Sequence, residues 1–538
     1  MATNGWNFAD IWEVVAEALP DAQAQVQGKR RYSWAEFDQR ANGIASALLG
    51  LGVERQDKVA HYLYNCPEYL ESMFGMYKTG LVPVNTNYRY ADDELLYLWD
   101  NADAVAVVFH GTFTERIEGL RSKLPKVKGW LWVDDGSGPR PDWAIDYEEA
   151  AAANPGRVEA PWGRSGDDLY MLYTGGTTGM PKGVMWRQED LFLNLNASAA
   201  RRYAVEEGLA GIKPMLTAPG MVQLPACPLM HGTGAFTSMS ALTAGGSVVT
   251  LSGRTFDVEE LLDTIQAERV NTMAIVGDAF AKPMLNALDA NPGRWDISSL
   301  VLIASSGVMW SEATKQGLLR HHPSMILADA FSSSEALGMG TSVSTGGQAT
   351  RTAKFSLGEN ARVITEDGRD VEPGSGEVGM VAVKGRGVPI GYYKDPEKSA
   401  RTFKVIDGER YSIPGDFATV EADGSLKLLG RGSVCINTGG EKVFPEEVEE
   451  ALKEHPAVAD AVAVGVPDDR FGEAICALVQ ARPGATVEEA DVIAHVKSRL
   501  AGYKAPRRVF AIDTVGRAPN GKVDYKRLRE LAISRVGG

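Results

Sequence analysis

Short runs rich in Val, Ile and Leu alternate with helix-like stretches along most of this chain. Residues 34–50 repeat apolar side chains at helical spacing and end on glycine, which predicts an amphipathic helix. Residues 58–64 and 104–109 read as strands, and a second helix is expected between them over residues 68–79. The unbroken apolar run at 104–109 is typical of a parallel sheet that is covered on both faces. We therefore expect an α/β fold of layered sheets and helices.

The C-terminal part of the chain is predicted to form a smaller module. Residues 445–453 begin with proline and carry carboxylates in the first turn, which predicts a helix. Residues 458–466 and 474–479 read as strands. A capping-box pattern at residues 486–489 predicts the start of another helix. This part therefore reads as an α+β domain.

A change in composition near residue 430 marks a predicted domain boundary. The strand-like residues 425–429 give way there to small and polar residues. We therefore expect two domains, a large N-terminal one of layered α/β subdomains over residues 1–430 and a small one over residues 431–538.

Charge and composition exclude several classes of protein. The formal net charge of −15 produces an acidic field that repels nucleic-acid phosphates, so no nucleic-acid partner is expected. The four cysteines lie far apart without a CxxC pair, which argues against a disulfide framework and a zinc site. Residues 1–20 lack Lys and Arg, unlike a secretory signal, and the apolar runs are shorter than the about 20 residues that span a bilayer. We expect a cytoplasmic protein without an integral membrane segment.

The most specific local signal is the run TGGTTGMPKG at residues 174–183, which follows the apolar residues 169–172. Four glycines and three threonines supply backbone N–H groups and hydroxyls, the donors that a polyphosphate needs, and Lys182 adds a positive charge. Lys182 stands between Pro181 and Gly183, so the run is not a Walker A loop. The sequence predicts a phosphate-binding loop.

With this loop, the chain resembles the adenylate-forming superfamily of acyl-CoA synthetases, firefly luciferase and amino-acid adenylation domains. The resemblance covers almost the whole length. It rests on further motifs that occur in the order of the family, at residues 228–234, 331–335, 411–416, 430–431, 440–449 and 517–522. The loop variant, with Met180 and the trailing Val184-Met-Trp186, looks most like bacterial fatty-acid and sterol-side-chain CoA ligases.

The resemblance implies ATP and Mg²⁺ as cofactors and a set of residues that bind them. Glu335 matches the acid that holds Mg²⁺, joined by Thr174, and Asp416 matches the carboxylate that accepts both ribose hydroxyls. The ATP-binding residues implied are Thr174, Gly175, Gly176, Thr177, Thr178, Gly179, Lys182, Ser306, Gly307, Phe331, Ser334, Asp416 and Arg431.

The catalytic residues implied by the resemblance are His231, Glu335 and Lys522. Attack of a carboxylate on the α-phosphate of ATP brings two anions together, so the ammonium of Lys522 would lower a largely electrostatic barrier. The implied second step has a thiol displace AMP after the small, mobile domain rotates about a hinge. The hinge residue implied is Ser433, and the second-step residues are Gly439, Gly440 and Glu441. Ser433, Asn437 and Gly175 depart from the residues that many relatives carry, which leaves domain rotation and the second step open.

The acyl pocket implied by the resemblance is lined by His231, Phe236, Met239, Val276, Gly277, Phe280 and Met309. These residues are mainly apolar or small, which suits a fatty, aryl or steroid-like acid. An amino-acid substrate is disfavoured because residues 235–239 lack the Asp that pairs its ammonium. The chain ends soon after Lys522 without a carrier segment, so CoA is the expected acceptor.

The sequence therefore predicts an ATP-dependent acyl-CoA synthetase for a medium-chain or long-chain fatty acid or a bulky cyclic acid. Three alternatives stay open: a carrier-protein thiol as acceptor, luciferase-like oxidation of the adenylate, and an aryl-acid CoA ligase. A non-catalytic nucleotide-binding homologue is disfavoured because Lys522 and Glu335 are both present. Chain length of the acid, and whether the protein forms a homodimer, stay open.

Overall fold

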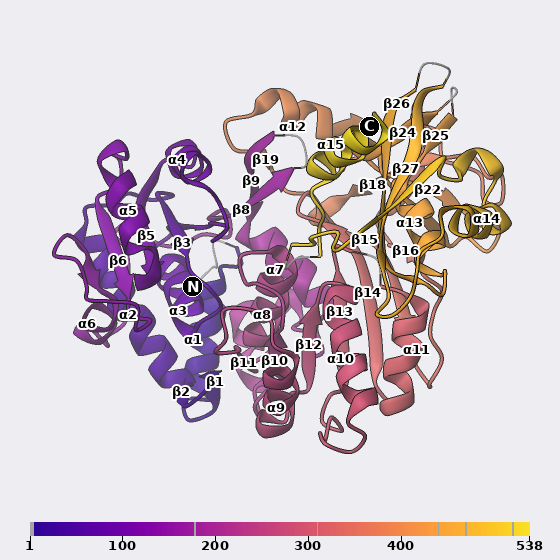
Figure 1. The fold of residues 1–538 in the computed structure, drawn as a ribbon. Helices are drawn as coiled ribbons and strands as arrows, with labels where there is room; N and C mark the ends of the chain where they lie inside the picture. The colour runs from indigo at the N-terminus through magenta and orange to yellow at the C-terminus, as the bar shows by residue number, and fades with distance from the viewer. Residues whose placement is uncertain are drawn as a thin grey trace. The chain divides into compact units, whose positions relative to one another are not determined.

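The computed structural model describes residues 5–176, 179–308, 310–438, 441–468, 471–518 and 521–537. By its internal packing the chain divides into two compact units (Figure 1). Unit 1 comprises Met1–Gly338, Ser342–Thr350 and Val383–Ser412, and unit 2 comprises Met339–Thr341, Arg351–Ala382 and Ile413–Gly538. The predicted domain boundary at residue 430 falls inside unit 2 and stays a prediction.

One sheet of unit 1 has the strand order β19-β9-β8-β4-β3-β5-β6-β7. The strands from β8 to β7 in this order pair in parallel, whereas β9 and β19 are antiparallel additions. Every residue of β5 is buried, which confirms the predicted two-sided strand. The bounds are β3 (Lys58–Tyr62), β4 (Val82–Asn85), β5 (Ala104–His110), β6 (Gly129–Val133), β7 (Ile145–Asp146), β8 (Leu169–Gly176), β9 (Gly179–Arg187) and β19 (Gly391–Tyr392).

A second sheet in unit 1 has the order β2-β1-β11-β10-β12-β13-β14, in which β2 is antiparallel to β1 and the other neighbours are parallel. β20 (Phe403–Ile406) and β21 (Glu409–Ser412) form a hairpin. The bounds are β1 (Gln23–Gln27), β2 (Arg30–Ser33), β10 (Val222–Pro225), β11 (Ser247–Val249), β12 (Thr272–Ile275), β13 (Leu302–Ser306) and β14 (Ile326–Ser333), followed by β15 (Ala336–Ser344).

Helices cover and separate the sheets of unit 1 (Figure 1). α3 packs against β4 of one sheet and β1 of the other, and every one of its residues is buried, as expected for a helix between two layers. α2 begins at the predicted residue with a capping box between Ser33 and Glu36. The bounds are α1 (Phe8–Ala18), α2 (Trp34–Gly50), α3 (Pro67–Lys78), α4 (Asp92–Asn101), α5 (Thr114–Leu120), α6 (Tyr147–Ala153), α7 (Gln188–Ser198), α8 (Gly232–Thr243), α9 (Val258–Glu268), α10 (Asp278–Ala290), α11 (Glu312–His321) and α12 (Pro396–Thr402).

Unit 2 combines a set of antiparallel strands with a C-terminal sheet flanked by helices. The strands of this set are β16 (Lys354–Leu357), β17 (Ala361–Ile364), β18 (Gly379–Lys384), β22 (Asp416–Val420) and β23 (Leu426–Arg431), and the last two residues of β18 fall in unit 1. The C-terminal sheet consists of β24 (Ile436–Thr438), β25 (Glu441–Val443), β26 (Val458–Asp468), β27 (Gly472–Ala481) and β28 (Arg508–Ile512). Its helices are α13 (Pro445–Lys453), α14 (Glu489–Arg499) and α15 (Tyr525–Val536).

The two faces of the C-terminal sheet are buried by different helices. Along β26, Ala461 and Ala463 join the core that contains α13 and α14, whereas Val462 and Val464 join the core that contains α15. This alternation follows from the two-residue period of a strand. It confirms the predicted α+β module.

The predicted capping box at residues 486–489 is not formed. α14 begins at Glu489 and has Glu488 at its N-cap without a side-chain hydrogen bond. The Glu489 carboxylate instead accepts hydrogen bonds from the Val509 N–H at 2.8 Å and from Arg508 at 3.1 Å. Contacts with β28 have therefore overridden a local sequence signal.

Within the described ranges, no helix combines the length and the apolar character that crossing a membrane requires.

Candidate active site

Several predicted site residues, from the acyl pocket and from the nucleotide site, lie at the carboxyl ends of parallel strands in unit 1. Gly277 comes shortly after β12, Ser306 is the last residue of β13, and Phe331 lies near the end of β14. Gly307 follows with a φ of 93°, a conformation that favours glycine. Because β12, β13 and β14 are parallel neighbours, these residues share one edge of the sheet, where ligands bind in open α/β sheets.

The predicted phosphate loop is the end of an antiparallel hairpin formed by β8 and β9. Thr174 lies opposite Lys182 in this hairpin, so the hydroxyl and the ammonium belong to paired positions. Gly175 is exposed. Gly176 pairs with Gly179, and the predicted residues Thr177 and Thr178 lie outside the described residues. A hairpin, rather than a strand followed by a helix, distinguishes this loop from a Walker A loop.

Glu335 is tied to the same hairpin through Tyr392. The hydroxyl of Tyr392 donates a hydrogen bond to Oε1 of Glu335 at 2.9 Å, and Oγ of Ser412 donates to the Glu335 carbonyl at 2.6 Å. Tyr392 itself pairs with Val184 of β9. Ser334, the predicted neighbour, accepts a hydrogen bond from the indole of Trp186 at 3.1 Å. The structure thus brings the predicted metal-binding acid and the predicted phosphate hairpin together.

Two lysines accompany this group. Nζ of Lys182 lies 3.4 Å from Oδ2 of Asp395, and the Nζ atoms of Lys182 and Lys398 lie 5.9 Å and 5.1 Å from the ring centroid of Tyr392. Burial, followed by the adjacent Lys182, lowers the pKa of Lys398 to about 8. Tyr392, Asp395 and Lys398 were not among the residues predicted from the sequence. All three lie in the segment YYKDPEK, residues 392–398, whose aromatic and charged side chains were the only indication of them in the sequence.

The chemistry of Glu335 fits Mg²⁺. Among the described residues there is no group of three or more His, Cys, Asp or Glu side chains that could hold a metal ion. Mg²⁺ nevertheless needs only one or two carboxylates, because it completes its shell with water and substrate phosphates. A lone acid beside the predicted phosphate-binding hairpin is therefore sufficient.

The predicted acyl-pocket residues fall into two packing groups. Phe236 and Met239 of α8 are buried, and Phe236 packs edge-on against Tyr170, with ring centroids 5.9 Å apart. Val276 and Phe280 belong to another core cluster, around β12, β13 and α10. Gly277 between them has a φ of 54°, and Met309 lies outside the described residues. The acyl pocket stays a prediction.

The accessible face of α8 carries different residues. His231 is the N-cap residue of α8 and is half-buried. Thr233, Thr237 and Ser240 are also half-buried, at spacings that place them on one side of the helix. These three residues were not predicted to line the acyl pocket, because the predicted pocket residues were mainly apolar. Their spacing of four and three residues in the sequence indicates that they share one side of a helix.

In unit 2, the two predicted nucleotide residues lie opposite each other on paired strands. Asp416 of β22 is in register with Arg431 of β23, and Nε of Arg431 donates to Oδ1 of Asp416 at 3.2 Å. Asp416 is only 6% exposed, so the arginine also stabilises a buried carboxylate. The structure thus brings the two predicted nucleotide residues together, and their roles stay predictions.

Lys522 stands on a turn that is fixed by an ion pair. Arg517 donates to both carboxylate oxygens of Asp460, at 2.6 Å and 2.8 Å, and to the carbonyl of Gly521 at 3.1 Å. The Lys522 carbonyl accepts the N–H of Ala518 at 2.8 Å, and the Lys522 side chain is exposed. Arg517 therefore holds the backbone next to the predicted catalytic lysine.

The predicted second-step residues are described only in part. Glu441 begins β25 and is exposed, whereas Gly439 and Gly440 lie outside the described residues. Ser433 lies in a short 3-10 turn, Gly432–Val434. The roles of these residues stay predictions.

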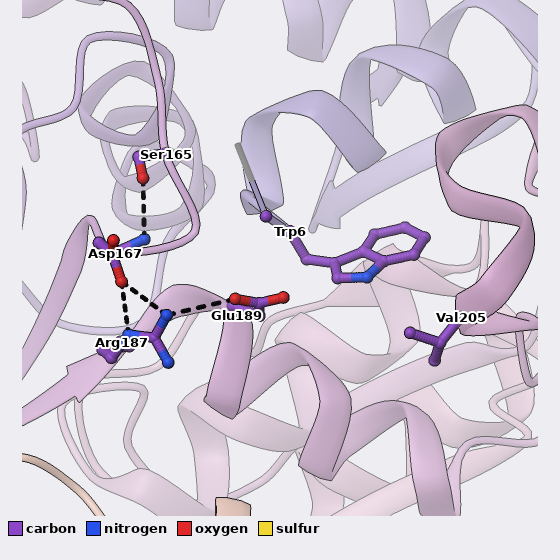
Figure 2. A pocket seen from close by; sticks show the side chains of 7 residues that line it. Trp6, Ser165, Asp167, Arg187, Glu189 and Val205 are labelled. Carbon is purple, nitrogen blue, oxygen red and sulfur yellow. Dashed lines mark hydrogen bonds and ion pairs between the residues drawn. The ribbon is translucent and has the colours of Figure 1, made fainter. Parts of the chain in front are cut away.

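A separate hollow in unit 1 does not fit a nucleotide. Its lining consists of Gly5, Trp6, Ser165, Asp167, Arg187, Glu189 and Val205, none of which was predicted (Figure 2). Arg187 is its cation, and it is neutralised by Asp167 at 2.6 Å and Glu189 at 3.3 Å. A phosphate would have to displace these carboxylates.

Comparisons with known proteins show to which family the chain belongs. Residues 12–393 match the family model "AMP-binding enzyme", and residues 447–522 match "AMP-binding enzyme C-terminal domain". The chain is 41% identical, over 98% of its length and 97% of the relative, to a "Medium/long-chain-fatty-acid--CoA/3-oxocholest-4-en-26-oate--CoA ligase" of Mycolicibacterium smegmatis.

A second relative is similar in sequence, and a solved structure is similar in fold. A "3-oxocholest-4-en-26-oate--CoA ligase" of Rhodococcus rhodochrous is 41% identical over 97% of this chain and 95% of that protein. The crystal structure of an anthranilate CoA ligase in complex with anthranoyl-AMP superposes with a TM-score of 0.84 and 22% identity, covering 99% of this chain and 98% of that one. This structural likeness confirms the α/β fold with a large N-terminal and a small C-terminal part. The chain therefore belongs to the AMP-binding enzyme family, in agreement with the adenylate-forming resemblance of its motifs.

Proposed function

We propose that the chain is an ATP-dependent, AMP-forming acyl-CoA synthetase that converts a medium-chain, long-chain or sterol-type carboxylic acid into its CoA thioester. The observation that carries the proposal is the near full-length match, at 41% identity, to ligases whose names specify such acids. The grouping of Lys182, Tyr392 and Glu335 supports it, because an adenylating enzyme has to hold a polyphosphate and its metal at one place. We place the reaction in the cytoplasm.

In the first half-reaction, the hairpin formed by β8 and β9 binds the phosphates of ATP. Its backbone N–H groups, the Thr174 hydroxyl and the Lys182 ammonium orient the chain of phosphates. Bound Mg²⁺, held through Glu335, would neutralise charge on the phosphate oxygens. Asp416 accepts the ribose hydroxyls while Arg431 orients its carboxylate.

Lys522 serves the transfer itself. Its ammonium stabilises the negative charge that builds up as the acid carboxylate attacks the α-phosphate. The ion pair between Arg517 and Asp460 holds the turn that carries Lys522, which reduces the entropy lost when the ammonium is positioned. The products of this step are the acyl-adenylate and pyrophosphate.

In the second half-reaction, the CoA thiol displaces AMP from the acyl-adenylate. The side of unit 2 that carries Glu441, at the start of β25, is our candidate for the surface facing CoA. His231, at the N-terminus of α8, is our candidate for the residue beside the reacting carboxyl group.

The test is pyrophosphate release from MgATP across fatty, aryl and steroid carboxylic acids, each with and without CoA, with AMP and thioester followed by mass spectrometry. CoA-dependent turnover with equal amounts of AMP and thioester is the expected result, highest for fatty or sterol-type acids. Pyrophosphate release without thioester on every acid would remove CoA as the acceptor and favour a carrier-protein thiol or oxidation of the adenylate. Turnover on aryl acids alone would overturn the proposed acid class.

A further inference from the structure

Two ammonium groups lie on the same aromatic ring next to the phosphate hairpin. Lys182 comes from β9 and Lys398 from α12, and their Nζ atoms lie 5.9 Å and 5.1 Å from the ring centroid of Tyr392. Tyr392 is also the residue that holds Glu335. Both cations therefore belong to the surroundings of the predicted metal and phosphate site in unit 1.

The backbone that carries Lys398 is fixed on the hairpin. Asp395 caps α12 by accepting the N–H of Lys398 at 3.0 Å, and Pro396 follows it in the first turn. Oγ of Ser399 accepts the N–H of Tyr392 at 2.9 Å, and Tyr392 pairs with β9. α12 is thus attached to the strand that carries Lys182, so the two lysines keep their relative places.

The carboxylates near these cations are already engaged. Asp395 uses Oδ1 for the helix cap and Oδ2 for Lys182. Glu335 accepts the hydroxyl of Tyr392. Two neighbouring ammonium groups repel each other, and burial with the nearby Lys182 lowers the pKa of Lys398. An anion with several oxygens would relieve this repulsion by bonding to both groups.

We propose that Lys398 is a second phosphate-binding cation, which acts with Lys182 to hold the pyrophosphate end of ATP and the pyrophosphate product. This inference rests on the proposed function, since it takes the hairpin to be the place where ATP phosphates bind. It deepens that function by assigning to α12 the recognition of the two outer phosphates. AMP lacks those phosphates, so its binding is independent of Lys398.

The probe is inorganic pyrophosphate with Mg²⁺, titrated calorimetrically into the full-length protein and its variants, with AMP as the second ligand. Lys398→Met is expected to weaken pyrophosphate binding about 10-fold, the size of one lost charge-assisted contact, and to raise the KM for ATP similarly. AMP binding should stay unchanged. Lys398→Arg keeps the charge and should retain most of the affinity.

Lys394 offers a matched control four residues away. Its Nζ pairs with Asp103 at 2.7 Å and lies 5.3 Å from the ring centroid of Tyr393. Lys394→Met also removes one positive charge, so it measures the general effect of charge, and pyrophosphate binding should change less than about 2-fold.

Three results would count against the inference. The inference would be overturned if Lys398→Met bound pyrophosphate with wild-type affinity. It would also be overturned if the variant lost AMP affinity as much as pyrophosphate affinity, because that would indicate general damage to the site. No pyrophosphate binding by the wild-type protein would overturn both this inference and the proposed function. Lys398-dependent pyrophosphate binding in a protein that makes no CoA thioester would support the inference while removing the CoA ligase.

Discussion

Glu446 is a carboxyl group whose environment favours its neutral form. It lies in the first turn of α13, and its Oε2 is buried, although part of the side chain is exposed. Burial, followed by the charge of Glu449, raises the pKa of Glu446 to about 8. Gly430 lies opposite it with a φ of 135°, a conformation that favours glycine, and a Cβ there would force the Glu446 carboxyl group to move. A glycine in the predicted boundary segment thus makes room for a buried acid.

The raised pKa of Glu446 predicts a pH-dependent stability of unit 2. Between its ordinary value of 4.5 and about 8, the folded state binds more protons than the unfolded state, so the unfolding free energy falls as pH rises. Glu446→Gln keeps a neutral side chain and removes this dependence. By calorimetry, we expect the unfolding temperature of wild-type protein to fall at least ~2 °C more than that of the variant between about pH 5 and about pH 9.

Glu447 supplies the control for this prediction. It is the next residue of α13, but its carboxylate pairs with Lys504 at 2.6 Å and Lys427 at 3.8 Å. Glu447→Gln removes ion pairs, so it should lower the stability between about pH 5 and about pH 9 while leaving the pH dependence in place. Equal pH slopes in wild-type protein and Glu446→Gln would show that another group causes the dependence.

At the scale of elements, α8 shows how burial refines a prediction from residue type. Phe236 and Met239 have exposed fractions of 7% and 0%, so a ligand could reach them only after the core rearranged. Thr237 is half-buried on the other side of the helix, and its hydroxyl donates to the Thr233 carbonyl at 2.8 Å. Substrate contact is therefore expected from the threonine face of α8.

Thr237→Phe tests this assignment. A bulky ring on that face should reduce the maximum chain length of the acids that the enzyme accepts, because it fills the space that the far end of a long acid needs. We expect kcat/KM to fall at least ~10-fold for the longest acid accepted and less than ~3-fold for the shortest. Thr237→Val, which keeps the volume and loses only the hydroxyl, should retain the chain-length profile. An unaltered profile in Thr237→Phe would place the acyl group elsewhere.

The elements that the sequence predicts well are those with local causes. α2 has its capping box and helical spacing within its own residues, and the predicted residues 445–453 coincide with α13. The predicted capping box of α14 was wrong because the Glu489 carboxylate accepts a hydrogen bond from Val509 of β28, which is distant in sequence. The group of Lys182, Glu335, Tyr392 and Lys398 could be predicted only in part, since three chain segments meet there and only two carry a recognisable motif.

At the scale of the whole molecule, the predicted catalytic and ATP-binding residues are divided between the two units. Lys182 and Glu335 belong to unit 1, whereas Asp416 and Lys522 belong to unit 2. Each unit contains its own supporting contacts: Tyr392 for Glu335, and Arg517 with Asp460 for Lys522. A substitution in either unit can therefore impair the predicted site while leaving the supporting contacts of the other unit in place.

Lys522→Ala should separate the two half-reactions. Removal of one preorganised cation from the charge-building step is expected to slow adenylation at least ~10²-fold, measured as acid-dependent pyrophosphate release. The rate of thioester formation from preformed acyl-adenylate and CoA should stay within about 3-fold of the wild-type rate. In that step no carboxylate attacks the α-phosphate, so the charge that Lys522 stabilises does not build up. Lys526→Ala, which removes another exposed lysine of unit 2, should leave both rates near wild type. An equal loss of both half-reactions in Lys522→Ala would assign Lys522 to general binding rather than to the adenylation transition state.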